Sequence, residues 1–170
     1  MLQIKRVHKR EEIDQMGGKD VMVRSFVDVY KDMPLQDIHP DFTSLKDMQR
    51  FYEEYFQSEL NHFDRYIWIQ AFDKDKLVGF VTYEVEEGNK AYMNTLVVAP
   101  EEQGKGIGKR LVFSIRECTP HITEIRLLLR KLNVKGRRFY DRLGFTDFPY
   151  TREDNFVDTA LLTGLRWMAH

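Results

Sequence analysis

A glycine-rich turn between an expected strand and an expected helix carries the clearest chemical signal in this sequence. The apolar stretch 96–98 ends just before Pro100, and the segment 103–109 has glycine at alternate positions: Gly104, Gly106 and Gly108. Glycine lets the backbone approach a ligand closely, and the first N–H groups of a helix have no partner inside the helix. A strand, a glycine turn and a helix N-terminus in this order predict a binding site for a phosphate group.

Two familiar phosphate-binding motifs do not fit this turn. A dinucleotide-binding fingerprint requires a third glycine where Leu111 stands, and a Walker A loop requires Ser or Thr where Arg110 follows Lys109. A tight turn without any ligand is the remaining alternative. Because each ordered glycine costs conformational entropy, a turn alone explains three of them poorly.

The elements that must position this turn follow from the hydrophobic pattern. Strands are expected at 2–7, 67–72, 77–85, 91–98, 124–129, 145–150 and 157–167, and helices at 11–30 (with a break at Gly17-Gly18), after Thr43 or Ser44, at 106–118 and at 134–143. Short turns join the strands between 67 and 98, which predicts antiparallel hairpins. The expected fold is α/β (α+β), with a mixed, mostly antiparallel central sheet and helices on both faces.

Length and composition narrow the class of protein. The 170 residues predict one domain, 1–170, and the net charge of −1 gives no reason to expect nucleic acid or an anionic membrane as a partner. No apolar stretch approaches the ~20 residues that span a bilayer, and the N-terminus lacks the apolar core of a signal peptide. The single cysteine, Cys118, fits a reducing cytoplasm, and the five histidines lack metal-ligand spacing, so no metal is expected.

Two motifs together resemble the GNAT superfamily of acetyl-CoA-dependent N-acetyltransferases. Gln103-x-x-Gly106-x-Gly108, directly after a strand, is similar to the pyrophosphate-binding motif of that family. The segment 133–145 is similar to the family's next motif, N-x-x-A-x-x-F-Y-x-x-x-G-F, with Gly136 in place of alanine. The order of elements extends the resemblance from about Ile67 to Phe145.

The resemblance implies how acetyl-CoA would bind. In this family the strand before the turn splays away from its neighbour, and the pantetheine arm pairs with the backbone in the gap. Asn133 would contact that arm, cap the following helix, or do both. The residues implied in binding are Leu96, Val97, Val98, Gln103, Gly104, Lys105, Gly106, Ile107, Gly108, Lys109, Asn133, Gly136 and Tyr140.

The resemblance also implies a general acid, Tyr140, which would protonate the departing CoA thiolate; a core tyrosine is the alternative. The base is harder to place, because the strand 91–98 carries no acid where family members often have a carboxylate or histidine. The nearest carboxylate is Glu84 on the preceding strand, which is a candidate base or a solvated strand residue. A less basic acceptor or a proton path through water would also fit.

The register of the hairpin decides which face Glu84 occupies. A two-residue turn puts Tyr83 opposite Asn94, whereas a three-residue loop puts Thr82 opposite Asn94 and Glu84 opposite Tyr92. The sequence leaves both registers open.

The implied function is acetyl transfer from acetyl-CoA to a primary amine, by direct attack in a ternary complex. The acceptor is a small-molecule amine or a peptide or protein amine, and a homodimer is compatible because family members are often dimers. A catalytically silent acyl-CoA-binding module and an enzyme for a longer acyl-CoA are the alternatives. Polar candidates for acceptor recognition are Asp28, Asp37, His39, Asp147, Tyr150, Glu153 and Asp154.

Overall fold

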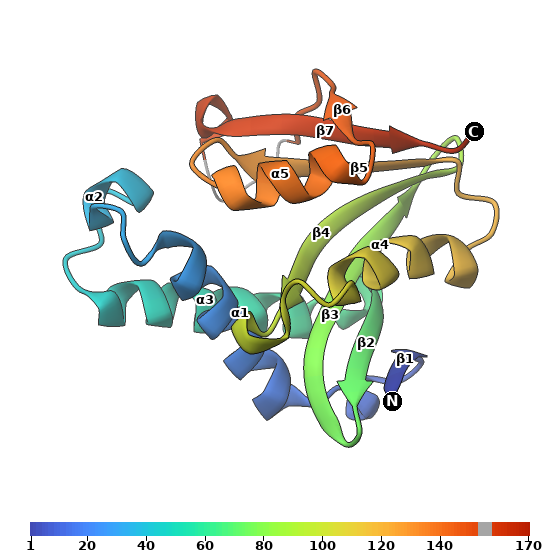
Figure 1. The fold of residues 1–170 in the computed structure, drawn as a ribbon, viewed down its shortest axis with the longest axis horizontal. Coiled ribbons are helices and arrows are strands. Elements are labelled where there is room, and N and C mark those ends of the chain that lie inside the picture. Colours follow the sequence, from blue (N-terminus) through green and yellow to red (C-terminus); the bar gives the residue numbers. More distant parts are fainter. Residues whose placement is uncertain (153–157) are drawn as a thin grey trace.

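In the computed structural model, residues 1–152 and 158–170 are described, and they contain one seven-stranded sheet with the order β1-β2-β3-β4-β5-β7-β6 (Figure 1). The β4–β5 pair is parallel and every other neighbouring pair is antiparallel. The strands are β1 (Leu2–Arg6), β2 (Ile67–Asp73), β3 (Lys76–Glu86), β4 (Lys90–Val98), β5 (Glu124–Arg130), β6 (Thr146–Asp147) and β7 (Leu162–Met168). The expected mixed, mostly antiparallel sheet is confirmed.

Helices cover both faces of the sheet. The helices are α1 (Gln15–Tyr30), α2 (Leu35–Ile38), α3 (Leu45–Asn61), α4 (Ile107–Cys118) and α5 (Val134–Arg142), with 3₁₀ turns at Arg10–Glu12, Phe63–Arg65, Pro100–Glu102 and Thr159–Leu161. One core cluster packs α1 and α3 against one face, and the other packs α4 and α5 against the opposite face. Successive strand residues, such as Val97 and Val98, enter opposite clusters, as strand alternation requires. Among the described residues, no helix is long and apolar enough to cross a membrane.

The first long helix starts later than expected and is not broken. Asp14 caps α1 by accepting a hydrogen bond from the Gly17 N–H at 2.9 Å, and the residues before it form a separate 3₁₀ turn. The helix then runs through Gly17-Gly18 without interruption. A Cβ on Gly18 would lie 2.7 Å from the Phe56 ring, so this glycine permits close packing of α1 on α3.

The helix α3 begins as the sequence predicts. The Ser44 side chain accepts from the Asp47 N–H, and the Asp47 carboxylate accepts from the N–H groups of Thr43 and Ser44, which forms a capping box. The aromatic stripe of this helix is mostly core, since Met48, Tyr52 and Phe56 are buried.

The β3–β4 hairpin follows the three-residue register only near its turn. Glu84 lies opposite Tyr92, but the pairing then shifts so that Thr82 lies opposite Thr95. Asn94 is therefore the extra residue of a β-bulge. Neither expected register includes this bulge, because a bulge depends on tertiary contacts rather than on turn length.

The closing strands are shorter than expected. The strand expected at 145–150 is only Thr146–Asp147, and Pro149 cannot donate to a ladder. The strand expected at 157–167 begins at Leu162, after a 3₁₀ turn, and Val157 lies outside the described residues.

Candidate functional site

The central feature of the site is a gap between β4 and β5. These strands pair only where Lys90, Ala91 and Tyr92 meet Glu124, Ile125 and Arg126, and farther along they diverge. A cavity of about 860 Å³ is lined by both strands beyond this point, together with the glycine turn and residues of α1, α3 and α5. The resemblance implied this splayed strand pair, and the structure has it.

The edge of β4 that faces this gap has no β5 partner beyond Tyr92. An unpaired strand edge presents N–H and C=O groups that can bind an extended ligand. The side chains of Leu96 and Val98 line the cavity. Val97 instead packs into the core beneath α1 and α3, so only its backbone can contribute to a ligand in the gap.

The glycine turn has the conformation that only glycine adopts easily. Gly104 and Gly106 have φ values of +81° and +83°, and a Cβ on either would meet no atom within 4 Å. Backbone conformation, not crowding, therefore requires these glycines. Gly106 is the N-cap of α4 and supplies no side-chain cap, so the first N–H groups of the helix are open to an anion.

Most of the turn borders the cavity. Lys105 is the exception, since it does not line the cavity and its ammonium pairs with Glu102 at 2.9 Å. The turn residues that line the cavity are Gln103, Gly104, Gly106, Ile107, Gly108 and Lys109.

Contacts with β4 and α5 hold the turn in place. The Gln103 side chain donates to the Val98 carbonyl at 3.0 Å and accepts from the Lys135 ammonium at 2.5 Å. A Cβ on Gly108 would lie 3.0 Å from the Phe139 ring, so glycine here lets the start of α4 approach α5. The turn, the end of β4 and α5 therefore form one wall of the site.

Asn133 is the N-cap of α5, as one of its two expected roles requires. Its Oδ1 accepts from the Gly136 N–H at 2.7 Å, and both residues line the cavity. A Cβ on Gly136 would lie 2.7–2.8 Å from the Asn133 side chain. Glycine in place of the family's alanine thus leaves room for this cap.

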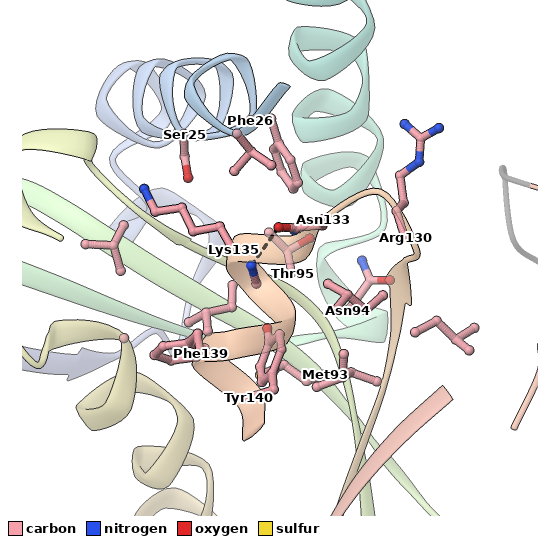
Figure 2. Close-up of a pocket in the computed structure, with 18 of the residues that line it drawn as sticks. Ser25, Phe26, Met93, Asn94, Thr95, Arg130, Asn133, Lys135, Phe139 and Tyr140 are labelled. Carbon is pink, nitrogen blue, oxygen red and sulfur yellow. Dashed lines mark hydrogen bonds between the residues drawn. The ribbon is translucent and has the colours of Figure 1, made fainter. Parts of the chain in front are cut away.

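Tyr140 reaches the cavity from α5, and Figure 2 shows its hydroxyl directed into the open space. The residue is 7% exposed, and burial raises the pKa of its phenol. Within the described part of the chain, no hydrogen bond to this hydroxyl is found. A buried phenol that keeps its proton and is directed into a cavity is suited to donate it.

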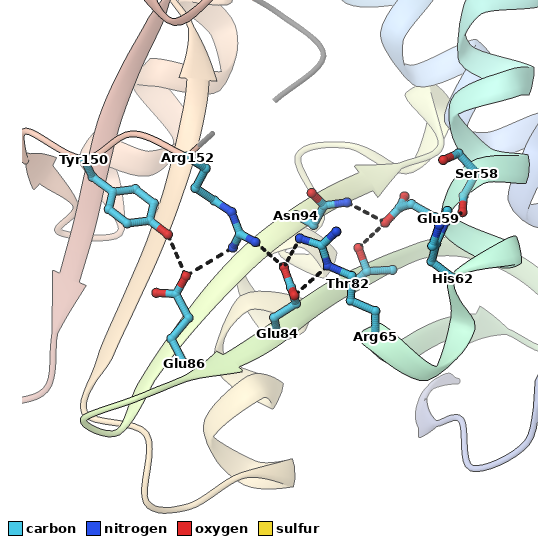
Figure 3. A network of polar contacts seen from close by, with 10 residues as sticks. All are labelled: Ser58, Glu59, His62, Arg65, Thr82, Glu84, Glu86, Asn94, Tyr150 and Arg152. Carbon is cyan, nitrogen blue, oxygen red and sulfur yellow. Dashed lines mark hydrogen bonds and ion pairs between the residues drawn. The ribbon is translucent and has the colours of Figure 1, made fainter. Parts of the chain in front are cut away.

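Glu84, the candidate base, lies in a different environment. Its carboxylate pairs with Arg65 at 2.7 Å and with Arg152 at 2.8 Å, and Arg152 also bridges to Glu86 (Figure 3). Glu84 does not line the cavity. Because both carboxylate oxygens are engaged with guanidinium groups, this placement gives no support to Glu84 as the base.

The polar residues expected to recognise the acceptor are mostly elsewhere. Glu153 and Asp154 lie outside the described residues. The others do not line the cavity: Asp28, Asp37, His39, Asp147 and Tyr150.

A buried carboxylate that sequence reasoning missed does line the cavity. Glu59 on α3 is 3% exposed and accepts hydrogen bonds from the hydroxyls of Thr82 and Thr95 and from the Asn94 amide, at 2.5, 2.7 and 2.9 Å. Burial raises the pKa of this carboxyl, and the three donors partly oppose that effect. The signal in the sequence is a glutamate that continues the buried stripe of an amphipathic helix, one turn after Phe56.

The fold places a glycine turn, an unpaired strand edge and a cavity together between two diverging strands. The model of the Acetyltransferase (GNAT) family matches residues 32–145, and the chain belongs to this family. The expected resemblance is confirmed.

Individual relatives agree with this assignment. The chain is 47% identical over 49 residues to a 5-NmdU N-acetyltransferase of Pseudomonas phage PaMx11, which is 29% of this chain and 34% of the relative. It is 30% identical over 79 residues to the peptidyl-lysine N-acetyltransferase YjaB of Salmonella typhimurium, which is 46% of this chain and 49% of the relative. The matches thus span about a third and about half of the lengths of these relatives.

A solved structure shares the whole fold. The PaiA N-acetyltransferase of Thermoplasma acidophilum, in complex with coenzyme A, has a TM-score of 0.73 and 19% identity, with 99% of each chain covered. This likeness confirms the fold.

Proposed function

We propose that this protein transfers an acetyl group from acetyl-CoA to a primary amine by direct attack in a ternary complex. The observation that carries the proposal is the splay of β4 from β5 beside a glycine turn with positive φ values. Family membership supports the same chemistry.

The chain offers complementary groups for the pyrophosphate and for the pantetheine arm of acetyl-CoA. The turn 103–109 and the open N-terminus of α4 suit the pyrophosphate, with Lys109 adding positive charge. The unpaired edge of β4 and the Asn133 side chain suit the amide groups of pantetheine. The thioester would then lie near Leu96, within the cavity that Tyr140 also lines.

Tyr140 supplies the proton that the departing thiolate needs. A phenol with an ordinary pKa of about 10 can donate to a thiolate of a similar or somewhat lower pKa. This phenol is protonated at neutral pH with its ordinary pKa, and burial raises that pKa further, which makes it a weaker acid than a free phenol.

The acceptor is a primary amine on a small molecule or on a peptide or protein. One relative is named a 5-NmdU N-acetyltransferase and the other a peptidyl-lysine N-acetyltransferase, and N-acetylation requires an amine acceptor. The cavity has room for such a group beside the α1–α3 wall, where aromatic side chains predominate.

Thermal unfolding with and without acetyl-CoA tests the first step. At a concentration of 100 times Kd, acetyl-CoA or CoA should stabilise the protein by about 2.7 kcal/mol. NAD, which has a pyrophosphate but no pantetheine, is the matched control and should produce a much smaller shift. The absence of a shift with both CoA compounds would contradict the proposal.

Turnover then separates an enzyme from a silent binding module. We expect release of free thiol from acetyl-CoA when a panel of primary amines is added, and succinyl-CoA should be a poorer donor. Binding of acetyl-CoA without thiol release for any amine would favour the silent module.

A further inference from the structure

Within residues 1–152 and 158–170, the buried carboxylate of Glu59 has no cationic partner. In the described residues, no lysine, arginine or histidine forms an ion pair with it, and its three hydrogen-bond donors are all neutral. Removing a carboxylate from water is costly unless a counter-charge or hydrogen bonds offset the loss. Glu59 lines the cavity, so a positively charged group of a ligand could supply the counter-charge that the described residues do not.

The hydrogen bonds leave room for one more donor. Oε2 accepts from both Thr82 and Asn94, whereas Oε1 accepts only from Thr95. A carboxylate offers about four acceptor positions, so three donors do not saturate it. An N–H group of a ligand can take the remaining position on Oε1.

The β-bulge explains why two consecutive residues of β4 contact the same carboxylate. In a regular strand Asn94 and Thr95 would face opposite sides of the sheet, but the extra residue lets both side chains hydrogen-bond to Glu59. Figure 3 shows the Asn94 amide directed toward the Glu59 carboxylate. These residues directly precede Leu96, beside which the thioester would lie. A group held by Glu59 is therefore next to the reacting carbon.

Glu59 and Tyr140 approach the cavity from different layers of the fold. Glu59 comes from α3 on one face of the sheet, and Tyr140 comes from α5 on the other. Tyr140 lines the same cavity as Asn94 and Thr95, the two β4 residues that bind Glu59 (Figure 2). An acceptor entering along α3 would meet the thioester on the side away from the phenol.

The walls near Glu59 suit an ammonium group. Aromatic faces attract cations, with stabilisation of about 0.5–2 kcal/mol. Tyr55 lines the cavity one helical turn before Glu59, whereas Arg65 already lies over the Tyr66 ring and Arg152 over the Tyr92 ring, at 5.5 and 4.0 Å. The other aromatic residues that line the cavity on this side are Phe26, Tyr30, Phe51 and Tyr52.

We propose that Glu59 binds the protonated amine of the acceptor and accepts one of its protons. This inference rests on the proposed acetyl transfer and names the base for it. A lysine-like amine with a pKa of about 10.4 is almost fully protonated at neutral pH and cannot attack until it loses a proton. Because Glu59 removes this proton, the amine does not need an unusually low pKa to react. The proposed substrate class is therefore a strongly basic primary amine.

The proton balance is complete with these two residues. The ammonium gives one proton to Glu59, and the neutral nitrogen attacks the thioester carbonyl. A C–N bond forms, the C–S bond breaks, and the sulfur takes the proton of Tyr140. The nitrogen loses its second proton to water, from which Tyr140 is reprotonated, and Glu59 releases its proton to solvent. One proton leaves per acetyl group.

Glu59→Gln tests the role, with thiol release measured for the best amine of the panel. At neutral pH kcat/KM should fall about 10²-fold, the lower end for a general base. The loss should shrink as the pH approaches the pKa of the amine, since the amine then deprotonates in solution. A merely structural defect would lower the rate by the same factor at every pH. Other titratable or charged groups at this end of the cavity are Tyr55, His62, Arg65, Tyr66, Tyr92 and Arg152.

Thr82→Val gives a second test that leaves the carboxylate in place. Thr82 does not line the cavity, and its hydroxyl donates to Glu59 and lowers the pKa of that carboxyl. Removing this donor should shift the acidic limb of kcat/KM to higher pH. Glu86→Gln, which alters a carboxylate outside the cavity, should leave the profile unchanged.

The outcomes separate the inference from the function on which it rests. If the wild-type protein binds acetyl-CoA but acetylates no amine, both the proposed acetyl transfer and the role of Glu59 are contradicted. If the wild type is active but Glu59→Gln shows no loss, or an equal loss at every pH, the role of Glu59 is overturned alone. The same holds if Glu84→Gln, rather than Glu59→Gln, shows the pH-dependent loss.

Discussion

Tyr140→Phe is expected to lower kcat about 10²-fold and to leave the Kd for acetyl-CoA nearly unchanged. The substitution removes only the hydroxyl, which lines the cavity and has no hydrogen bond to the described residues. The ring still packs against Phe139 and Phe145, at centroid distances of 5.1 and 5.2 Å. Steady-state thiol release with saturating amine and calorimetric titration with acetyl-CoA measure the two quantities.

A second buried tyrosine provides the matched control. The Tyr83 hydroxyl is hydrogen-bonded to Thr119 at 2.8 Å and does not line the cavity. Tyr83→Phe should cost about 1 kcal/mol of stability through the lost hydrogen bond and should leave kcat unchanged. Equal turnover by Tyr140→Phe and the wild type, with an acceptor slow enough for chemistry to limit the rate, would make Tyr140 a core residue.

The parts of the site that the sequence predicts are those determined by local geometry. Gly104 and Gly106 stand out because positive φ values need glycine, and the order of strand, turn and helix places them at a helix N-terminus. Asn133 is recognisable as a helix N-cap because asparagine is common at that position, where its side chain accepts from the backbone N–H three residues later, here that of Gly136. Spacing along the chain is sufficient for such features.

The parts that the sequence misses depend on contacts between distant residues. Glu84 is a reasonable candidate base from its strand position, but its carboxylate forms ion pairs with Arg65 and Arg152. Both arginines are distant in the sequence, so the residues around Glu84 do not predict these ion pairs. The sequence shows that Glu59 continues the buried stripe of its helix, but its hydrogen-bond donors come from β3 and β4, and the β-bulge at Asn94 brings two of them together. The face of a strand residue changes with a single inserted position, so the side chains of β3 and β4 that contact Glu59 cannot be assigned before the register is known.

Replacing Gly104 and Gly106 together by alanine should weaken acetyl-CoA binding about 10²-fold, which equals about 2.7 kcal/mol. A Cβ at these φ values costs roughly 1–2 kcal/mol per residue. Because both positions face open space, the turn can escape this strain by changing conformation, and its N–H groups then no longer converge on the pyrophosphate. Binding must restore the strained turn, so the cost appears in the Kd measured by calorimetry.

Two comparisons show whether this loss comes from the pyrophosphate site. Gly88 has a φ of +75° in the β3–β4 turn, and a Cβ there would meet only the flexible Lys90 side chain, at 3.4 Å. Gly88→Ala therefore imposes similar backbone strain and should lower stability without changing the Kd for acetyl-CoA. S-acetylpantetheine lacks the pyrophosphate, so its weaker binding should be the same for the double variant and the wild type. If its affinity fell as much as that of acetyl-CoA, the glycine turn would act on the shape of the whole cavity and not on the phosphates.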